Sequence, residues 1–153
     1  MELIELTAEN WTRAIELEVH EDQKEFVASN VKTIAQSKFY PEIIVKALGN
    51  KKEKIMVGLV AYFPTSELID EDMKDTAFIM RFMVDKNQQG KGYGRELLDL
   101  VIKEIKVAVP NTKKVNLTVL PNNSGAIGFY EKVGFVATGR ELFDELEYSL
   151  DLE

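Results

Sequence analysis

A strand, a glycine-rich loop and an amphipathic helix follow one another in the middle of the chain, and this succession most constrains the fold. Residues 76–84 are almost continuously apolar, interrupted by Arg81, which is typical of a strand covered on both faces. Beyond the loop, apolar side chains repeat at helical spacing from Leu97 to Ile105, the pattern of a helix with one buried face. A buried strand that leads into such a helix indicates a mixed α/β protein.

The N-terminal part predicts a strand at residues 2–6 followed by two short helices. Thr7 has the side chain of a helix N-cap, and the apolar Trp11, which we expect in the core, follows it at helical spacing. The second helix covers residues 29–38 and stops before a proline. Its expected buried face consists of Val31, Ile34 and Ala35.

Two segments rich in β-branched residues, 43–48 and 54–63, flank Gly49-Asn50, which predicts an antiparallel hairpin with its turn at that pair. The remaining expected elements are a strand at residues 115–120, a helix at 124–133 that ends at Gly134, and closing strands at 135–138 and 146–152. This order predicts a central sheet flanked by helices. Because the chain has 153 residues, we expect one domain over residues 1–153.

The composition excludes several classes of function. The chain carries 19 basic and 26 acidic residues, a net charge of −7, which disfavours nucleic acid as a partner because phosphate contacts supply most of that affinity. It has no cysteine and a single histidine, His20, so no cysteine-ligated or histidine-rich metal centre is expected. The acidic N-terminus and the lack of an apolar run of about 20 residues predict a soluble, cytoplasmic protein without a membrane segment.

The central loop has the chemistry of an anion site. Gly90, Gly92 and Gly94 alternate before the helix, where glycine permits positive φ and the helix start offers unpaired N–H groups to a phosphate or pyrophosphate. Lys91 and Arg95 add positive charge. The spacing does not fit the G-x-G-x-x-G dinucleotide fingerprint, and no Gly-Lys-Ser/Thr of a Walker A loop occurs. By themselves, the glycines also fit a flexible surface turn.

The loop residues 89–94, Gln-Gly-Lys-Gly-Tyr-Gly, resemble the Q/R-x-x-G-x-G/A acyl-CoA loop of the Gcn5-related N-acetyltransferase family. Residues 120–135 resemble the family's N-x-x-A-x-x-x-Y-x-x-x-G-F segment. The second motif is carried by Asn123, Ala126, Tyr130, Gly134 and Phe135. Residues 23–30, Tyr40-Pro41, residues 81–84 and the acidic Asp144-Glu145 are most similar to bacterial spermine/spermidine acetyltransferases.

This resemblance implies a single N-acetyltransferase domain with a mostly antiparallel sheet of about seven strands, about four helices and a splayed strand pair. It also implies acetyl-CoA as co-substrate, no metal, a small-molecule amine as acceptor, and a homodimer. Tyr130 stands at the family position of the general acid, although its alternative is an ordinary core tyrosine. The implied acetyl-CoA contacts are Met83, Val84, Gln89, Gly90, Lys91, Gly92, Tyr93, Gly94, Arg95 and Asn123.

The general base is not identified by the sequence. The strand at 77–84 contains no acid and carries Arg81 instead, which fits either a substrate contact or a structural ion pair. Glu25 and Glu145 are our candidates for binding a cationic substrate, and the alternative for each is a solvated charged face. Three functions therefore compete: acetylation of a polyamine or other diamine, acetylation of a protein N-terminus, amino acid or aminoglycoside, and acyl-CoA sensing without catalysis.

Overall fold

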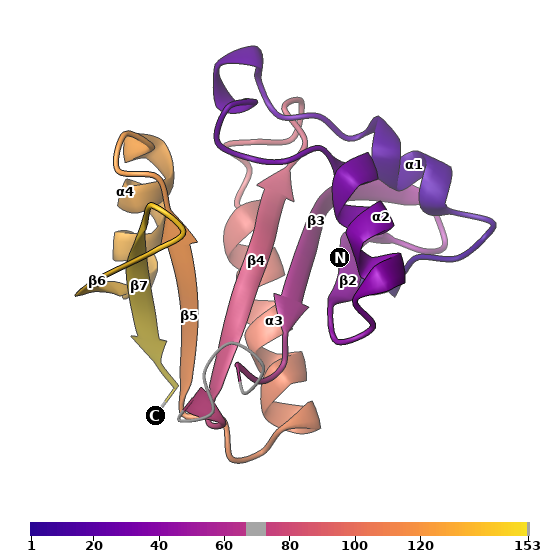
Figure 1. Cartoon of the computed structure of the whole chain (residues 1–153). Coiled ribbons are helices and arrows are strands. Elements are labelled where there is room, and N and C mark those ends of the chain that lie inside the picture. The colour runs from indigo at the N-terminus through magenta and orange to yellow at the C-terminus, as the bar shows by residue number, and fades with distance from the viewer. Residues whose placement is uncertain (67–72, 153) are drawn as a thin grey trace. The chain divides into compact units, whose positions relative to one another are not determined.

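The computed structural model describes residues 1–66 and 73–152. Its strands form a mixed seven-stranded sheet in the order β1-β2-β3-β4-β5-β7-β6, accompanied by four α-helices (Figure 1). The described ladders are antiparallel apart from β4 with β5. These features confirm the predicted α/β fold class. The chain divides into two compact units, residues 1–62 with 81–104 and residues 63–80 with 105–153.

The first unit contains the N-terminal half of the sheet. The elements that lie wholly within it are β1 (Glu2–Glu5), α1 (Trp11–Glu16), the 3-10 helix η1 (Glu21–Gln23), α2 (Asn30–Phe39) and β2 (Ile44–Asn50). β3 (Ile55–Phe63) belongs to it except for Phe63, which is assigned to the second unit. It also holds the end of β4 (Thr76–Val84) and most of α3 (Tyr93–Ala108). β2 pairs with both β1 and β3.

Helix α3 supplies the core of the first unit with the face that its sequence period predicts. Leu97, Leu98 and Val101 are fully buried. A Cβ on Gly58 of β3 would lie 2.8 Å from the carbonyl oxygen of Met83 and 3.4 Å from Leu97. The absence of a side chain at Gly58 therefore lets strand and helix approach closely, which positions the end of β4 and the loop that follows it.

The second unit contains β5 (Lys114–Val119), α4 (Ser124–Val133), β6 (Val136–Leu142) and β7 (Glu145–Asp151). Helix α4 has the predicted bounds, and Gly134 ends it with a left-handed φ of 119°. The parallel ladder joins Thr76–Ile79 of β4 to Lys114–Leu117 of β5, whereas β4 continues to Val84 and β5 to Val119.

Three local predictions for the first helices were wrong. The N-cap of α1 is Asn10, not Thr7, because the Asn10 side chain bridges the Thr7 N–H at 2.8 Å and the Glu5 carbonyl at 2.9 Å. Trp11 is 44% exposed rather than in the core. The buried residues of α2 are Asn30 and Thr33, while Val31 is 56% exposed.

The hairpin turn also differs from its prediction. Gly49 and Asn50 lie inside β2, opposite Met56 and Ile55, after a register shift at Leu48/Gly49. The turn occupies residues 51–54. The Asn50 side chain accepts a hydrogen bond from the Glu53 N–H at 3.1 Å, so this asparagine stabilises the turn from the last strand position. In the described part of the chain, no helix is long and apolar enough to cross a membrane.

Candidate functional site

The glycine loop leads from β4 into α3 with the backbone geometry that its sequence predicts. Gly90 has a φ of 77° and Gly92 a φ of 86°, values that side-chain-bearing residues adopt rarely. No atom lies within 4 Å of a Cβ built on either residue. The loop therefore presents open backbone immediately before the start of α3, where unpaired N–H groups favour an anion.

The Gln89 side chain fixes the beginning of this loop. Its amide nitrogen donates to the carbonyl oxygen of Val84 at 3.0 Å and to Oε1 of Gln23 at 3.0 Å, and its oxygen accepts from the Gln23 amide at 3.3 Å. Gln89 thus ties the loop to the end of β4 and to the segment after α1. This arrangement leaves the backbone of the loop, rather than the Gln89 side chain, for ligand contacts.

The two loop cations already contact neighbouring side chains. Lys91 donates to Oε1 of Gln88 at 3.1 Å, and Arg95 forms an i,i+4 ion pair with Asp99 at 3.1 Å. Both contacts are on the surface. Since exposed pairs of this kind contribute only about 0–1 kcal/mol, either cation can exchange its partner for an anionic ligand.

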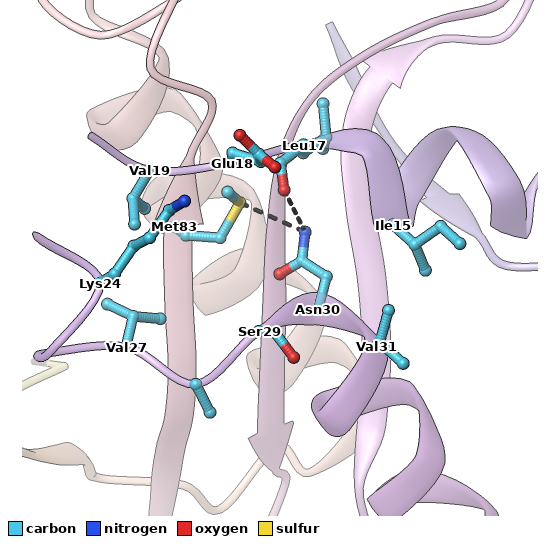
Figure 2. A pocket seen from close by; sticks show the side chains of 11 residues that line it. Ile15, Leu17, Glu18, Val19, Lys24, Val27, Ser29, Asn30, Val31 and Met83 are labelled. Atoms are coloured by element: carbon cyan, nitrogen blue, oxygen red, sulfur yellow. Dashed lines mark hydrogen bonds between the residues drawn. The ribbon is translucent and has the colours of Figure 1, made fainter. Parts of the chain in front are cut away.

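A cavity of about 360 Å³ lies in the same unit, between the segment after α1, the start of α2 and Met83 of β4 (Figure 2). Its walls are mostly apolar, and they include four polar residues. The lining residues are Ile15, Leu17, Glu18, Val19, Lys24, Val27, Ala28, Ser29, Asn30, Val31 and Met83. A cavity with apolar walls and a few polar groups is the usual form of a small-molecule site.

The charges of this cavity are paired. Lys24 contacts Glu21 at 2.8 Å, and Glu18 contacts Lys86 at 3.2 Å. The hydrogen bond and charge of Lys24 lower the pKa of Glu21, and the same pair raises the pKa of Lys24. The backbone is anchored as well, because Asp85 accepts from the Glu18 N–H at 2.9 Å. The cavity therefore carries opposite charges without a large excess of either sign.

The second unit holds the other predicted residues. Tyr130 is 8% exposed, and its ring makes edge contacts with Phe129 and Phe135 at centroid distances of 5.3 and 5.5 Å. Burial raises the pKa of the Tyr130 phenol above its ordinary value. Asn123 is the N-cap of α4, and its side chain accepts from the Ala126 N–H at 3.3 Å.

Two carboxylates on β7 make unequal contacts. Glu145 is half-buried and accepts from the Thr118 hydroxyl at 2.7 Å. Glu147 is only 3% exposed and accepts from the Thr138 hydroxyl at 2.8 Å. Arg140 of β6 also lies 3.8 Å from the Glu147 carboxylate, so a hydroxyl and a cation on β6 accompany its burial.

The structure gathers part of the predicted site into the first unit. Met83, Val84 and the loop 89–95 all belong to this unit. Arg81 lies there as well and donates to Oε1 of Gln36 at 3.3 Å. Glu25 is exposed and does not line the cavity beside Met83. The sequence reasoning missed Glu18 and Asn30 of that cavity. Their positions depend on contacts with distant residues, Asn30 with Ala14 and Glu18 with Asp85, so no local signal in the sequence marked them.

Among residues 1–66 and 73–152, no group of three or more histidine, cysteine or acidic side chains is arranged to hold a metal ion.

Comparison with known proteins gives a consistent family assignment. The chain is 26% identical over 137 residues to the spermine/spermidine N(1)-acetyltransferase of Bacillus subtilis (strain 168), covering 88% of this chain and 86% of the relative. It is 28% identical over 105 residues to the L-2,4-diaminobutyric acid acetyltransferase of Marinococcus halophilus, covering 69% of this chain and 55% of the relative.

Among solved structures, the fold matches that of the PaiA N-acetyltransferase from Thermoplasma acidophilum in complex with coenzyme A. The TM-score is 0.69 at 17% identity, with 98% of each chain covered. The profile of the acetyltransferase (GNAT) family matches residues 2–135. Because this match spans most of the chain and includes both motifs, the protein belongs to the acetyltransferase (GNAT) family.

Proposed function

We propose that this protein transfers an acetyl group from acetyl-CoA to a primary amine of a polyamine, such as spermidine or spermine, or of another diamine. The observation that carries the proposal is the open loop with left-handed Gly90 and Gly92 at the start of α3, in a chain of the GNAT family. The similarity to a spermine/spermidine acetyltransferase supports the choice of acceptor.

The residues of the loop fit the pyrophosphate of acetyl-CoA. The backbone N–H groups from Gly90 to Arg95 would hold it at the start of the helix. A side chain at Gly92 would have to adopt an unfavourable positive φ, and it would occupy the open space that the pyrophosphate needs. Tyr93 and Gly94 form the first turn of this helix. The backbone of Met83 and Val84 would pair with the pantetheine amides as an added strand does.

Bound acetyl-CoA supplies an activated acyl group, and the chain supplies the acceptor site and the proton transfers. An alkyl ammonium with a pKa of about 10.4 must lose a proton before it can attack. The thiolate that leaves takes up a proton, and we assign its donation to Tyr130. The edge contacts of the Tyr130 ring with Phe129 and Phe135 support the assignment, because they hold the phenol in one position. Asn123 is proposed as a further co-substrate contact.

For the cationic part of the acceptor we propose Glu25 and Glu145, with Arg81 as a further contact. Glu145 is half-buried and oriented by the Thr118 hydroxyl, whereas Glu25 is exposed. A carboxylate that is partly shielded from water binds an ammonium more strongly than an exposed one, so Glu145 is expected to contribute more. The protein is proposed to act as a single domain, as a homodimer and in the cytoplasm.

A diamino acid is the second candidate acceptor. The cation Lys24 lines the cavity beside Met83 and would accommodate a carboxylate, and one relative is named for L-2,4-diaminobutyric acid. Coenzyme A release should be measured with acetyl-CoA and a panel of polyamines, diamines, diamino acids, aminoglycosides and peptides. Preference for spermidine or spermine supports the proposal. Preference for another class of acceptor would replace the polyamine as the proposed substrate. Binding of acetyl-CoA without turnover on any amine would favour an acyl-CoA sensor.

A further inference from the structure

Asn30 is an unusual residue to find in the interior at the start of a helix. It is 6% exposed at the first position of α2, directly after the Ser29 N-cap. Solvent is available at that end of the helix, as the exposed Val31 next to it shows. Burial of an amide costs free energy unless its polar atoms are hydrogen-bonded, so the contacts of Asn30 indicate what its burial achieves.

The amide nitrogen of Asn30 is fully used within the protein. It donates to the carbonyl oxygens of Ala14 at 2.9 Å and Leu17 at 3.5 Å, and it contacts Sδ of Met83 at 3.7 Å. Ala14 lies in the last turn of α1 and Leu17 is its C-cap, and the Ala14 carbonyl also accepts from the Leu17 N–H at 3.4 Å. These contacts hold α1, α2 and β4 together and fix the rotamer of the Asn30 side chain.

The carbonyl oxygen of Asn30 has the opposite character. Within the described residues it accepts no hydrogen bond, and it is not among the fully enclosed polar atoms without a partner. Asn30 lines the cavity beside Met83. Figure 2 shows its nitrogen turned toward Leu17 and Met83 and its oxygen on the side of Val27. The cavity therefore contains a fixed acceptor that an N–H donor can reach.

We propose that Asn30 is a substrate-binding residue, whose Oδ1 accepts a hydrogen bond from the amino group that becomes acetylated. This inference rests on the proposed amine acetylation. The contact of the Asn30 amide nitrogen with Sδ of Met83 at 3.7 Å places this side chain beside the strand residue whose backbone is proposed to hold the pantetheine arm. One N–H of the amine is bound by Oδ1, which orients the nitrogen lone pair, while the apolar walls of Val19 and Val27 contact the methylene groups.

Asn30→Leu tests the role because it keeps the volume and removes the acceptor. Two ligands should be compared by calorimetry: n-butylamine, which has N–H donors, and butyltrimethylammonium, which has none. Asn30→Leu should weaken n-butylamine by about tenfold or more, the value of one hydrogen bond to a charged or buried group. It should change butyltrimethylammonium by less than about twofold. The control Thr33→Val removes a buried hydroxyl of α2 outside the cavity and should change neither ligand.

Comparing both ligands separates binding from structure, because a general distortion of the cavity weakens them equally. Equal weakening by Asn30→Leu would therefore overturn the proposal. The KM for acetyl-CoA should remain unchanged. If the variant does not fold, a crystal structure of the parent enzyme with coenzyme A and n-butylamine decides: the nitrogen lies within hydrogen-bond distance of Oδ1, or the proposal is wrong. If the parent acetylates amines without this contact, only the substrate-binding role of Asn30 is refuted. If the parent acetylates no amine, the proposed function itself is refuted.

Discussion

Burial alters the chemistry of the Tyr130 side chain. Desolvation is the cause that raises the pKa of Tyr130, and the ring lies between Phe129 and Phe135. Tyr130 is therefore a core residue, and the proton donation proposed for it would use the same buried phenol. An aromatic core that holds the phenol in one place would position this donor, whereas the raised pKa makes the phenol a weaker acid.

Replacement of Tyr130 by phenylalanine separates the two roles. We expect Tyr130→Phe to preserve the aromatic contacts and the affinity for coenzyme A, and to lower turnover about 100-fold because the proton donor is lost. Single-turnover kinetics with acetyl-CoA and spermidine would measure the chemical step. As a control, Tyr148→Phe alters another buried tyrosine of the same unit and should leave turnover nearly unchanged. An unaltered chemical step in Tyr130→Phe would return this residue to the core alone.

What the sequence predicts at the residue scale depends on whether the determinants are local. Gly134 was predicted correctly because its determinant is local. A helix that ends in a left-handed residue favours glycine at that position, whatever the rest of the fold contains. Asn30 was missed because its partner Ala14 lies 16 positions away. No local pattern distinguishes an asparagine that caps a neighbouring helix from one in solvent. Trp11 was misplaced for a similar reason, since its exposure is decided by packing and not by helical spacing.

The elements differ in how strongly their bounds are encoded. β4 and α4 have the predicted bounds because apolar runs and flanking turn residues agree at both ends. The β2–β3 hairpin does not, since its strand continues through Gly49 by means of a register shift. Added side-chain bulk at Gly49 would meet the Ile55 carbonyl oxygen at 2.0 Å. A glycine required by close strand approach was thus mistaken for a turn glycine.

The loop before α3 gives a test of the element that is proposed to hold the co-substrate. Gly92→Val places a β-branched residue at a φ of 86°, which should destabilise the fold by about 1–3 kcal/mol. It should also weaken coenzyme A binding at least about tenfold, measured by calorimetry at a temperature where the variant is folded. Gly125→Ala in α4, where a Cβ has open space, is the control and should leave binding intact. Parental affinity in folded Gly92→Val would show that the pyrophosphate binds elsewhere.

A polar cluster on the first unit connects β2, β3 and α3. The buried Tyr62 donates its hydroxyl hydrogen bond to Glu104, which pairs with Lys46 at 3.4 Å. Burial is the largest cause that raises the pKa of Tyr62, and the hydrogen bond to Glu104 is the second. Folding therefore favours the protonated phenol. The resulting stability is fully present below the ordinary tyrosine pKa of about 10 and is lost as pH rises through the higher folded-state value.

Tyr62→Phe should lower the free energy of unfolding by about 1–2 kcal/mol at neutral pH, because it removes a hydrogen bond to a charged group. The difference from the parent should shrink above pH 10 or so. Urea unfolding across this pH range would measure both effects. Lys51→Gln, which removes an exposed pair with Glu2 at 4.0 Å, should change stability by less than about 0.5 kcal/mol. A constant difference between Tyr62→Phe and the parent at all pH values would contradict the assignment.

At the scale of the whole molecule, the distribution of charge bears on the choice of substrate. The net charge of −7 attracts polyamines over long range, and this attraction weakens with salt. It does not by itself select a polyamine over any other cation. Selectivity requires carboxylates that contact the distal ammonium groups, and the two proposed carboxylates differ in how far they are shielded from water.

Glu→Gln substitutions test this selectivity because they keep the shape and remove the charge. We expect Glu145→Gln to raise the KM for spermidine about ten- to a hundredfold and Glu25→Gln to raise it less, since a shielded contact contributes more than an exposed one. The KM for n-butylamine should change little, because a monoamine has no distal cation. Added salt should weaken the use of spermidine in the parent and do so less in Glu145→Gln.

Steady-state kinetics with both amines, at saturating acetyl-CoA, provides the comparison. Glu53→Gln makes the same change of charge in the exposed hairpin turn at residues 51–54, so it controls for the effect of net charge alone. If it raised the KM for spermidine as much as Glu145→Gln does, the effect would be long-range attraction and not contact. Equal losses for spermidine and n-butylamine in Glu145→Gln would instead place this carboxylate at the reacting nitrogen. That nitrogen is the group assigned to Asn30, so the monoamine distinguishes the two sites directly.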